Sequence, residues 1–302
     1  MDSDRRRWCV VAGLWWAGRA VAQPETDPVV ESLTLPDARL ELQFAPGFDP
    51  ALRTEARAWI ERSAMAVSGY FGRFPVPAAD ILAIPSEGSG VRSGHTSHGE
   101  TGLLVRVRLG RQTTPAQLRA DWIMVHEMIH LAIPRVPRSQ NWLHEGIATY
   151  VEGVARARAG LLSPADVWHE WRRAMPQGQP QADDRGLDHT PTWGRTYWGG
   201  ALFCLLADVR IRQRSEGRLG LQQALQGVLA GGGGYHVAWP VERILATADA
   251  SVRQTTLAEL HRRLGPHAER IDLETLWREL GVEDGRLRDD APLAAVRRAI
   301  LS

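Results

Sequence analysis

The sequence is poor in cysteine, with only Cys9 and Cys204 among its 302 residues. Cys9 falls in a predicted signal peptide, so Cys204 is left alone and an internal disulfide is excluded. The apolar run ALFCLLADV around Cys204 indicates a small core residue rather than a reactive thiol. Charge of one sign is not in excess either, because the formal net charge is only +1. The sequence therefore gives no electrostatic reason to expect a nucleic-acid partner.

Long hydrophobic runs are also missing, and no segment after the first 22 residues approaches the length of a membrane span. Residues 1–22 have the pattern of a secretory signal: Arg5–Arg7 are positive, Trp8–Gly18 are apolar, and Ala20-Val21-Ala22 is a small-x-small cleavage site. We expect a mature chain that starts near Gln23 and is exported, to a periplasm or the medium. The alternative is an uncleaved N-terminal anchor. The paired arginines suggest twin-arginine export, but the residues after them fit that pattern poorly.

The remaining chain has the composition of a globular protein, 44% hydrophobic and 24% charged. Alternating stretches such as ARLELQF and LLVRVRL predict strands, and an amphipathic helix is expected over Pro50–Phe71. Residues 86–102, rich in glycine and serine, predict a loop. From Thr114 onward the patterns are mostly helical. We therefore expect an α+β fold with a single domain over residues 23–302, made of a mixed lobe with a small sheet (about 33–135) and a mainly helical lobe (about 139–302).

The helical part begins with a strong start signal. Thr114 is a candidate N-cap, Pro115 takes the first helical position, and Gln117 follows three residues after the cap. The pattern predicts one helix that runs from here to Pro134.

This helix contains HEMIH, in which His126 and His130 lie four residues apart and therefore on one face. Two neutral imidazoles are good ligands for Zn²⁺, and Glu127 beside them is placed to take a proton from water that the metal acidifies. The alternative is that both histidines are core residues without a metal. A catalytic zinc needs a third protein ligand, and a second predicted helix, NWLHEGIATYVEG, offers Glu145 and, as its competitor, His144.

Glu152 lies seven residues after Glu145 and so on the same helical face. It is a candidate acceptor for the free N–H of a ligand histidine, or else an ordinary solvated residue.

Together, HEMIH and WLHEGIATYVE resemble the gluzincin metallopeptidases of the aminopeptidase N type, whose second motif is W-L-x-E-G. The later segment TYWGGALFCLLADVRIRQRSEGRLGLQQAL resembles the helix that carries their transition-state tyrosine, and it is similar to the glycyl aminopeptidase family. The resemblance covers about residues 100–230. It implies His126, His130 and Glu145 as zinc ligands, Glu127 as general base, and Tyr197 as the hydroxyl that stabilises the oxyanion.

The sequence departs from that pattern in several places. Position 199 is glycine where the relatives usually have lysine, the spacing between the ligand glutamate and the tyrosine is shorter, and no G-x-M-E-N segment for the substrate amine precedes the zinc helix. No PDZ-like pattern follows. Tyr197 has the alternative role of packing between helices. His189, in the loop upstream, is a weaker oxyanion or substrate candidate, and its alternative is a loop residue without a role.

Two features near the site suggest how a substrate binds. LLVRVRLG is expected to be the sheet edge on which an extended peptide pairs, and Arg106 and Arg108 would then favour acidic substrates. The alternative is that these arginines on an exposed strand face serve solubility. The preceding loop, with His95 and His98, is a candidate for movement over the cleft, and its alternative is an ordinary flexible connection.

The sequence as a whole predicts an exported zinc metallopeptidase with a thermolysin-like fold, acting on a peptide or protein substrate. No nucleic acid and no membrane span after signal cleavage are expected. Two alternatives remain: an inactive protein of this fold that binds peptides or envelope partners, and a helical scaffold whose histidines never bind a metal.

Overall fold

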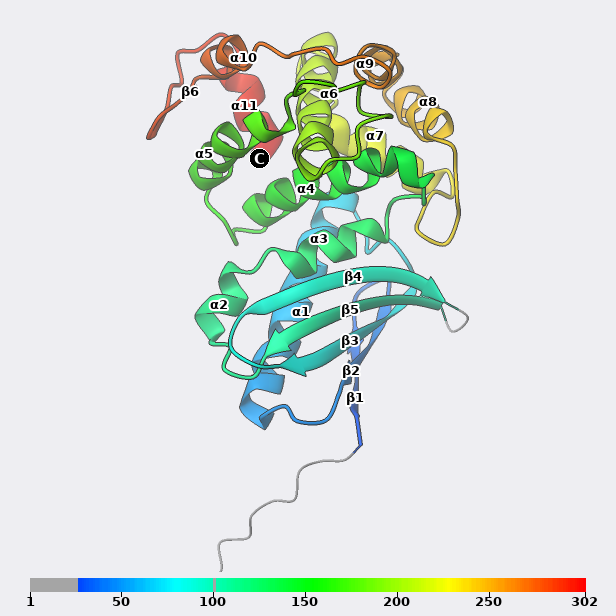
Figure 1. The fold of residues 1–302 in the computed structure, drawn as a ribbon. Coiled ribbons are helices and arrows are strands. Elements are labelled where there is room, and N and C mark those ends of the chain that lie inside the picture. The colour runs from blue at the N-terminus through cyan, green and yellow to red at the C-terminus, as the bar shows by residue number, and fades with distance from the viewer. Residues whose placement is uncertain (1–26, 100–101) are drawn as a thin grey trace, which may run out of the picture.

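The computed structural model describes residues 27–99 and 102–302, and it has an α+β fold, as the sequence predicts (Figure 1). A five-stranded sheet lies at one end of the molecule and most of the helices lie at the other. The predicted signal peptide lies outside the described residues. Among the residues that the structure describes, no helix is long and apolar enough to cross a membrane.

The sheet has the strand order β1-β2-β3-β5-β4. Its central strands β2, β3 and β5 are parallel to one another, and the edge strands β1 and β4 are antiparallel to their neighbours. The strands are β1 (Val29–Thr34), β2 (Arg39–Phe44), β3 (Ala78–Ser86), β4 (Val91–Gly99) and β5 (Gly102–Gly110). Alternate residues of β2, β3 and β5, including Leu40, Ile81 and Val105, are buried in the core.

Two predictions for this region are wrong. The predicted loop over residues 86–102 contains strand β4, so His95 and His98 are strand residues. As a result β5, which contains LLVRVRLG, lies between β3 and β4 and has no free edge. Arg106 and Arg108 are exposed on β5.

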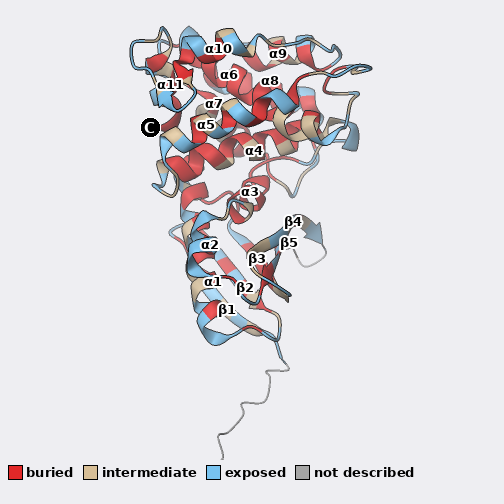
Figure 2. Cartoon of the chain, turned by 60° about the vertical axis from the view of Figure 1, so that its left-hand side comes forward, coloured by how far each residue is buried: buried red, intermediate tan, exposed pale blue. Residues whose placement is uncertain are grey.

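The helix α1 (Pro50–Phe71) has the predicted bounds. Its first turn is capped by Asp49, whose carboxylate accepts a 2.8 Å hydrogen bond from the Ala51 N–H. Gly72 ends the helix in the left-handed region, with φ of 78°. Along its length α1 shares one continuous core with the sheet and with the helices that follow (Figure 2).

The predicted single helix from Thr114 to Pro134 is two helices, α2 (Pro115–Ala120) and α3 (Ile123–His130). The Thr114 capping box is confirmed. The chain breaks at Asp121, which is extended with ψ of 143°, and the Asp121 carboxylate accepts a 3.1 Å hydrogen bond from the Met124 N–H. Because Asp121 caps α3, the helix that carries HEMIH has its own start and its own direction.

The rest of the chain is a group of helices with a two-stranded ribbon. They are α4 (Asn141–Arg158), α5 (Pro164–Ala174), α6 (Gly200–Arg214), α7 (Leu221–Ala230), α8 (Val241–Val252), α9 (Thr256–Leu264), α10 (Leu273–Leu280), α11 (Ala294–Leu301), and the ribbon β6 (Val282–Glu283) and β7 (Arg286–Leu287). Short 3-10 turns cover Arg138–Gln140 and Met175–Gly178, and a π-helical turn covers Arg195–Gly199.

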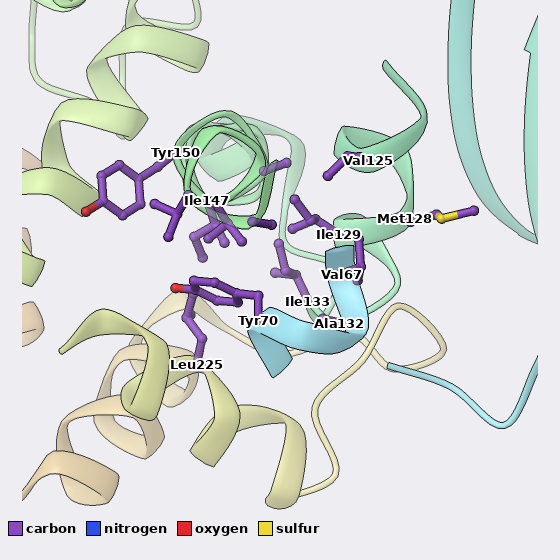
Figure 3. Packing of buried hydrophobic residues seen from close by; sticks show 14 of the residues in the cluster. Val67, Tyr70, Val125, Met128, Ile129, Ala132, Ile133, Ile147, Tyr150 and Leu225 are labelled. Atoms are coloured by element: carbon purple, nitrogen blue, oxygen red, sulfur yellow. The ribbon is translucent and has the colours of Figure 1, made fainter. Parts of the chain in front are cut away.

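The helix α3 lies between β4 and α4 and contacts both (Figure 1). Behind it, apolar side chains from α1, α3 and α4 meet, among them Val67, Ile129 and Ile147 (Figure 3). Each of the three is at most 2% exposed. This packing fixes the distance between α3 and α4, which carry the candidate metal ligands.

Candidate metal centre

His126, His130 and Glu145 converge on one point. The Glu145 Oε2 atom lies 3.2 Å from His126 Nε2 and 3.4 Å from His130 Nε2. A ligand atom from each residue lies within 4.8 Å of the other two, and both histidines are buried. The structure thus brings together the three residues that the sequence predicts as ligands.

The donor set fits a zinc ion. Burial lowers the pKa of His126, which keeps its imidazole neutral and able to donate a lone pair. Burial alone would raise the pKa of Glu145, but the contacts of its carboxylate with the His126 and His130 imidazoles hold this pKa well below its usual range. Two neutral imidazoles and one carboxylate are a known set for catalytic zinc. The Asn141 amide donates to the second Glu145 oxygen at 3.3 Å and so orients the carboxylate.

Glu145 reaches this point because α4 and α6 approach closely. A Cβ atom on Gly146 would lie 2.3 Å from the Gly200 Cα, and a Cβ on Gly200 would lie 2.2 Å from the Trp142 carbonyl oxygen. Neither position accepts a larger residue without movement of backbone. This close contact therefore positions Glu145 on α4 beside the π-helical turn that precedes α6.

His144 occupies a different position from the three candidate ligands. Its ring stacks on the His130 ring, with centroids 4.3 Å apart and an interplanar angle of 3°. Burial, followed by the neighbouring His130, lowers the pKa of His144 well below its usual value. His144 therefore packs as a neutral ring against His130, and Glu145 completes the cluster.

Glu127 is held by the edge strand of the sheet. Its Oε2 atom accepts a 2.8 Å hydrogen bond from the Thr96 hydroxyl. A Cβ on Gly94 would lie 2.5 Å from the Glu127 Cγ, so only glycine leaves room for this carboxylate. Glu127 follows His126 directly, which puts an acceptor for a proton beside the candidate metal position. Thr96 belongs to the predicted loop over residues 86–102, and the sequence does not predict its contact with Glu127.

Tyr197 lies on the π-helical turn Arg195–Gly199. Its ring stacks against His126 with centroids 6.2 Å apart, and against Trp193 at 5.8 Å. Burial, and then the negative charges of Glu145 and Glu127, raise the pKa of Tyr197 to about 12. The phenol is therefore protonated at neutral pH and can donate its hydrogen beside the metal position.

Gly199 has a packing role. A Cβ at this position would lie 3.0 Å from Leu187 Cδ2 and 3.2 Å from the Gly178 carbonyl oxygen. Gly199 is buried, and it is not among the residues that line the cavity. A side chain at position 199 would be in tight contact with Leu187 and the Gly178 backbone, and these neighbours would have to shift by a few tenths of an ångström.

Two predicted site residues lie away from the cluster. Glu152 does not contact a ligand histidine; it forms a 2.5 Å ion pair with Arg156, and burial raises its pKa to about 7. The Nδ1 atoms of His126 and His130 have no hydrogen-bond partner within the described part of the chain. His189 is exposed on a loop and does not line the cavity.

The cluster opens into a cavity of about 770 Å³. Its walls come from β4, α3, the α3–α4 connection, α4, the π-helical turn and the segment before α8. From β4 they include His95, which was predicted near the site, whereas His98 does not line the cavity. Tyr235 also lines it, more than a hundred residues from HEMIH along the chain, and no sequence pattern connects the two.

No protein-family model and no curated protein matches the sequence. The fold is similar to solved structures of zinc metallopeptidases. An aminopeptidase N family protein from Idiomarina loihiensis has a TM-score of 0.53 and 13% identity over 90% of this chain and 49% of its own. A variant of a two-domain M1 zinc metallopeptidase bound to L-arginine has a TM-score of 0.52 and 16% identity over 81% of this chain and 54% of its own.

A further M1 zinc metallopeptidase variant, from Deinococcus radiodurans, has a TM-score of 0.50 and 16% identity over 80% of this chain and 53% of its own. The fold is M1 peptidase-like. The chain spans about half the length of these proteins. At such identities the likeness concerns the fold, and function has to be argued from the residues of the site.

Proposed function

We propose that this protein is a zinc-dependent metallopeptidase that hydrolyses peptide bonds in the cavity beside α3. The observation that carries the proposal is the convergence of His126, His130 and Glu145 on one point, with Glu127 alongside. The metallopeptidase fold supports it.

Zinc bound at this cluster would polarise a substrate carbonyl and lower the pKa of water. Glu127 accepts a proton from the attacking water and later delivers it to the leaving amine. The Thr96 hydroxyl holds the Glu127 carboxylate in place for both transfers. Tyr197 donates its protonated phenol to the oxyanion that develops on the substrate. The chain thus has a residue of the required type for each role.

The substrate would bind along β4, since β5 has no free edge. An extended peptide can add to β4 as a further strand, because within the described residues β4 pairs with β5 on one side and with no strand on the other. Gly94, His95 and Thr96 of β4 line the cavity, so a peptide on this edge passes directly over Glu127. Because Arg106 and Arg108 do not line the cavity, they do not support a preference for acidic substrates.

The test is cleavage of a mixed peptide library by the zinc-loaded protein, with and without a chelator. Chelation is expected to abolish cleavage. Glu127→Gln should lower kcat by roughly 10²- to 10⁴-fold, because the amide cannot accept the proton, while zinc binding is retained. Unchanged cleavage in Glu127→Gln would contradict the mechanism. Zinc binding without any cleavage would favour the alternative, an inactive peptide-binding protein.

Export is proposed on the arginine-rich and apolar residues before Gln23. Mass spectrometry of the mature protein should find a chain that starts near Gln23, and an intact Met1 would contradict this part of the proposal.

A further inference from the structure

Along the edge of β4 that faces away from β5, alternate residues present their backbone N–H and C=O groups outward. In an antiparallel pair every second residue turns its N–H and C=O away from the partner strand. The Thr96 carbonyl accepts a hydrogen bond from another part of the chain, so Thr96 is one of these outward residues. By the same alternation, Gly94 and His98, two positions away on either side, also face outward. Gly94 and Thr96 line the cavity and His98 does not.

The Tyr235 side chain is hydrogen-bonded to one of these outward-facing carbonyl groups. Its hydroxyl donates a 2.9 Å hydrogen bond to the Thr96 carbonyl oxygen. An extended peptide that paired with β4 beyond this point would need the same oxygen for one of its own N–H groups. The Tyr235 ring also lines the cavity and packs beside His144, with centroids 5.5 Å apart. Pairing along β4 is therefore interrupted at Thr96.

Hydrogen bonds tie the main chain of Tyr235 to the segment that follows α3. Its N–H donates to the Leu131 carbonyl at 3.1 Å, and its carbonyl accepts from Arg135 Nε at 3.0 Å. On the following residues, the Val237 carbonyl accepts from the Arg135 N–H at 2.9 Å, and the Trp239 N–H donates to the Arg135 carbonyl at 3.0 Å. These four hydrogen bonds make the segment around Tyr235 a fixed wall of the cavity.

The other end of the regular edge is marked by a β-bulge. Val91 pairs with Leu109 but Ser93 pairs with Arg108, so one residue of β4 is extra. A bulge bends the strand and interrupts its pairing. The regular edge between the bulge and Tyr235 thus runs over residues 93–96. At about 3.3 Å per residue it has room for roughly three substrate residues.

The interruption lies close to the reacting bond. Thr96, whose carbonyl is bonded to Tyr235, also donates its hydroxyl to Glu127 at 2.8 Å. A peptide bond whose hydrolysis Glu127 catalyses must lie within hydrogen-bonding reach of this carboxylate. Tyr235 therefore meets β4 at the same residue that positions the Glu127 carboxylate.

We propose that Tyr235 is a specificity-determining residue that limits how far a substrate chain extends along β4 on one side of the scissile bond. This rests on the proposed peptidase function. A long chain can leave the groove only on the side away from Tyr235.

The test measures binding, so that it does not depend on turnover. Zinc-loaded Glu127→Gln protein is titrated with synthetic peptides that share one core sequence, taken from a cleaved or tightly bound short peptide. The core is extended by zero, two or four alanines at its N-terminus or at its C-terminus. Extension at one end should weaken binding at least tenfold, and extension at the other end should change it less than threefold. The penalty should disappear when Tyr235→Ala is added.

Two further variants sharpen the test. Tyr235→Phe keeps the ring but frees the Thr96 carbonyl, so it should relieve part of the penalty. His236→Ala changes an exposed neighbour in the same segment and should leave the penalty unchanged. Zinc content and circular dichroism of each variant check that the site and the fold are intact.

The possible outcomes separate this inference from the proposed function. Equal affinity along both series, a penalty that Tyr235→Ala leaves unchanged, or no binding of any peptide would overturn the role of Tyr235. If the wild type cleaves no peptide but extension still weakens binding in a Tyr235-dependent way, the role of Tyr235 in the groove is supported and the peptidase proposal fails.

Discussion

Gly146 on α4 and Gly200 on α6 are in backbone contact, because a Cβ on Gly146 would lie 2.3 Å from the Gly200 Cα. The contact sits one residue after the candidate ligand Glu145 and three residues after Tyr197. Two groups of the site, from segments about 50 residues apart, are thus positioned by one helix crossing.

Gly146→Ala is therefore expected to destabilise the fold by about 1–3 kcal/mol, because the added methyl forces the helices apart. Zinc affinity should fall as well, since Glu145 moves with α4. Thermal unfolding and zinc titration measure the two effects. The matched control is Gly69→Ala in α1, where an added Cβ would meet nothing within 4 Å. This control should be neutral or stabilise by up to about 1 kcal/mol through helix propensity. Equal effects of the two substitutions would contradict the crossing argument.

Tyr197→Phe removes the hydroxyl and keeps the ring that stacks on His126. It should lower kcat by roughly 10²-fold or more, with a smaller effect on KM, because the donor acts on charge that develops in the transition state. Steady-state kinetics on a cleaved peptide give the two constants. Tyr70→Phe is the control, because the buried Tyr70 hydroxyl has no hydrogen-bond partner within the described residues. An unchanged kcat in Tyr197→Phe would remove Tyr197 from the mechanism.

Glu152 should make stability depend on pH. Burial raises its pKa from 4.5 to about 7 in the folded protein, despite the opposing charge of Arg156. Between these values the folded state binds more protons than the unfolded state, so the contribution of Glu152 to stability is full below about pH 4.5 and is lost as pH rises through 7.

The measurement is Tm from pH 4.5 to 8 for the wild type and Glu152→Gln, whose amide does not titrate. The Tm of the wild type should fall relative to that of the variant as pH rises. Glu61→Gln, at an exposed position of α1, controls for the change of charge. A difference in Tm between wild type and Glu152→Gln that stays constant over this range would show that Glu152 does not titrate there.

The sequence predicted the parts of the site that depend on local spacing. His126, Glu127 and His130 share one helix, so the 3.6-residue period alone places them together. The prediction of Glu145 required the W-L-x-E-G motif as well as helical periodicity, because Glu145 comes from a second helix. The bounds of α1 were predictable because Asp49, Pro50 and Gly72 are ordinary signals for helix ends.

The parts that were missed depend on contacts distant in sequence. Strand β4 is rich in glycine, serine and histidine, and in the described part of the chain it pairs only with β5, so neither composition nor alternation marked it. The break at Asp121 lies inside a continuous helical pattern and depends on a cap that the pattern does not show. Tyr235 reaches Thr96 across 139 residues.

The most direct test of the account is the zinc content of the purified protein, measured by mass spectrometry of the metal after dialysis. The wild type should hold about one zinc per chain. Glu145→Ala should lose it, because only two imidazoles remain, whereas the exposed-site control Glu61→Gln should keep it. A wild type that binds no zinc when the metal is supplied, or a Glu145→Ala protein that binds it as tightly as the wild type, would contradict the proposed metal centre.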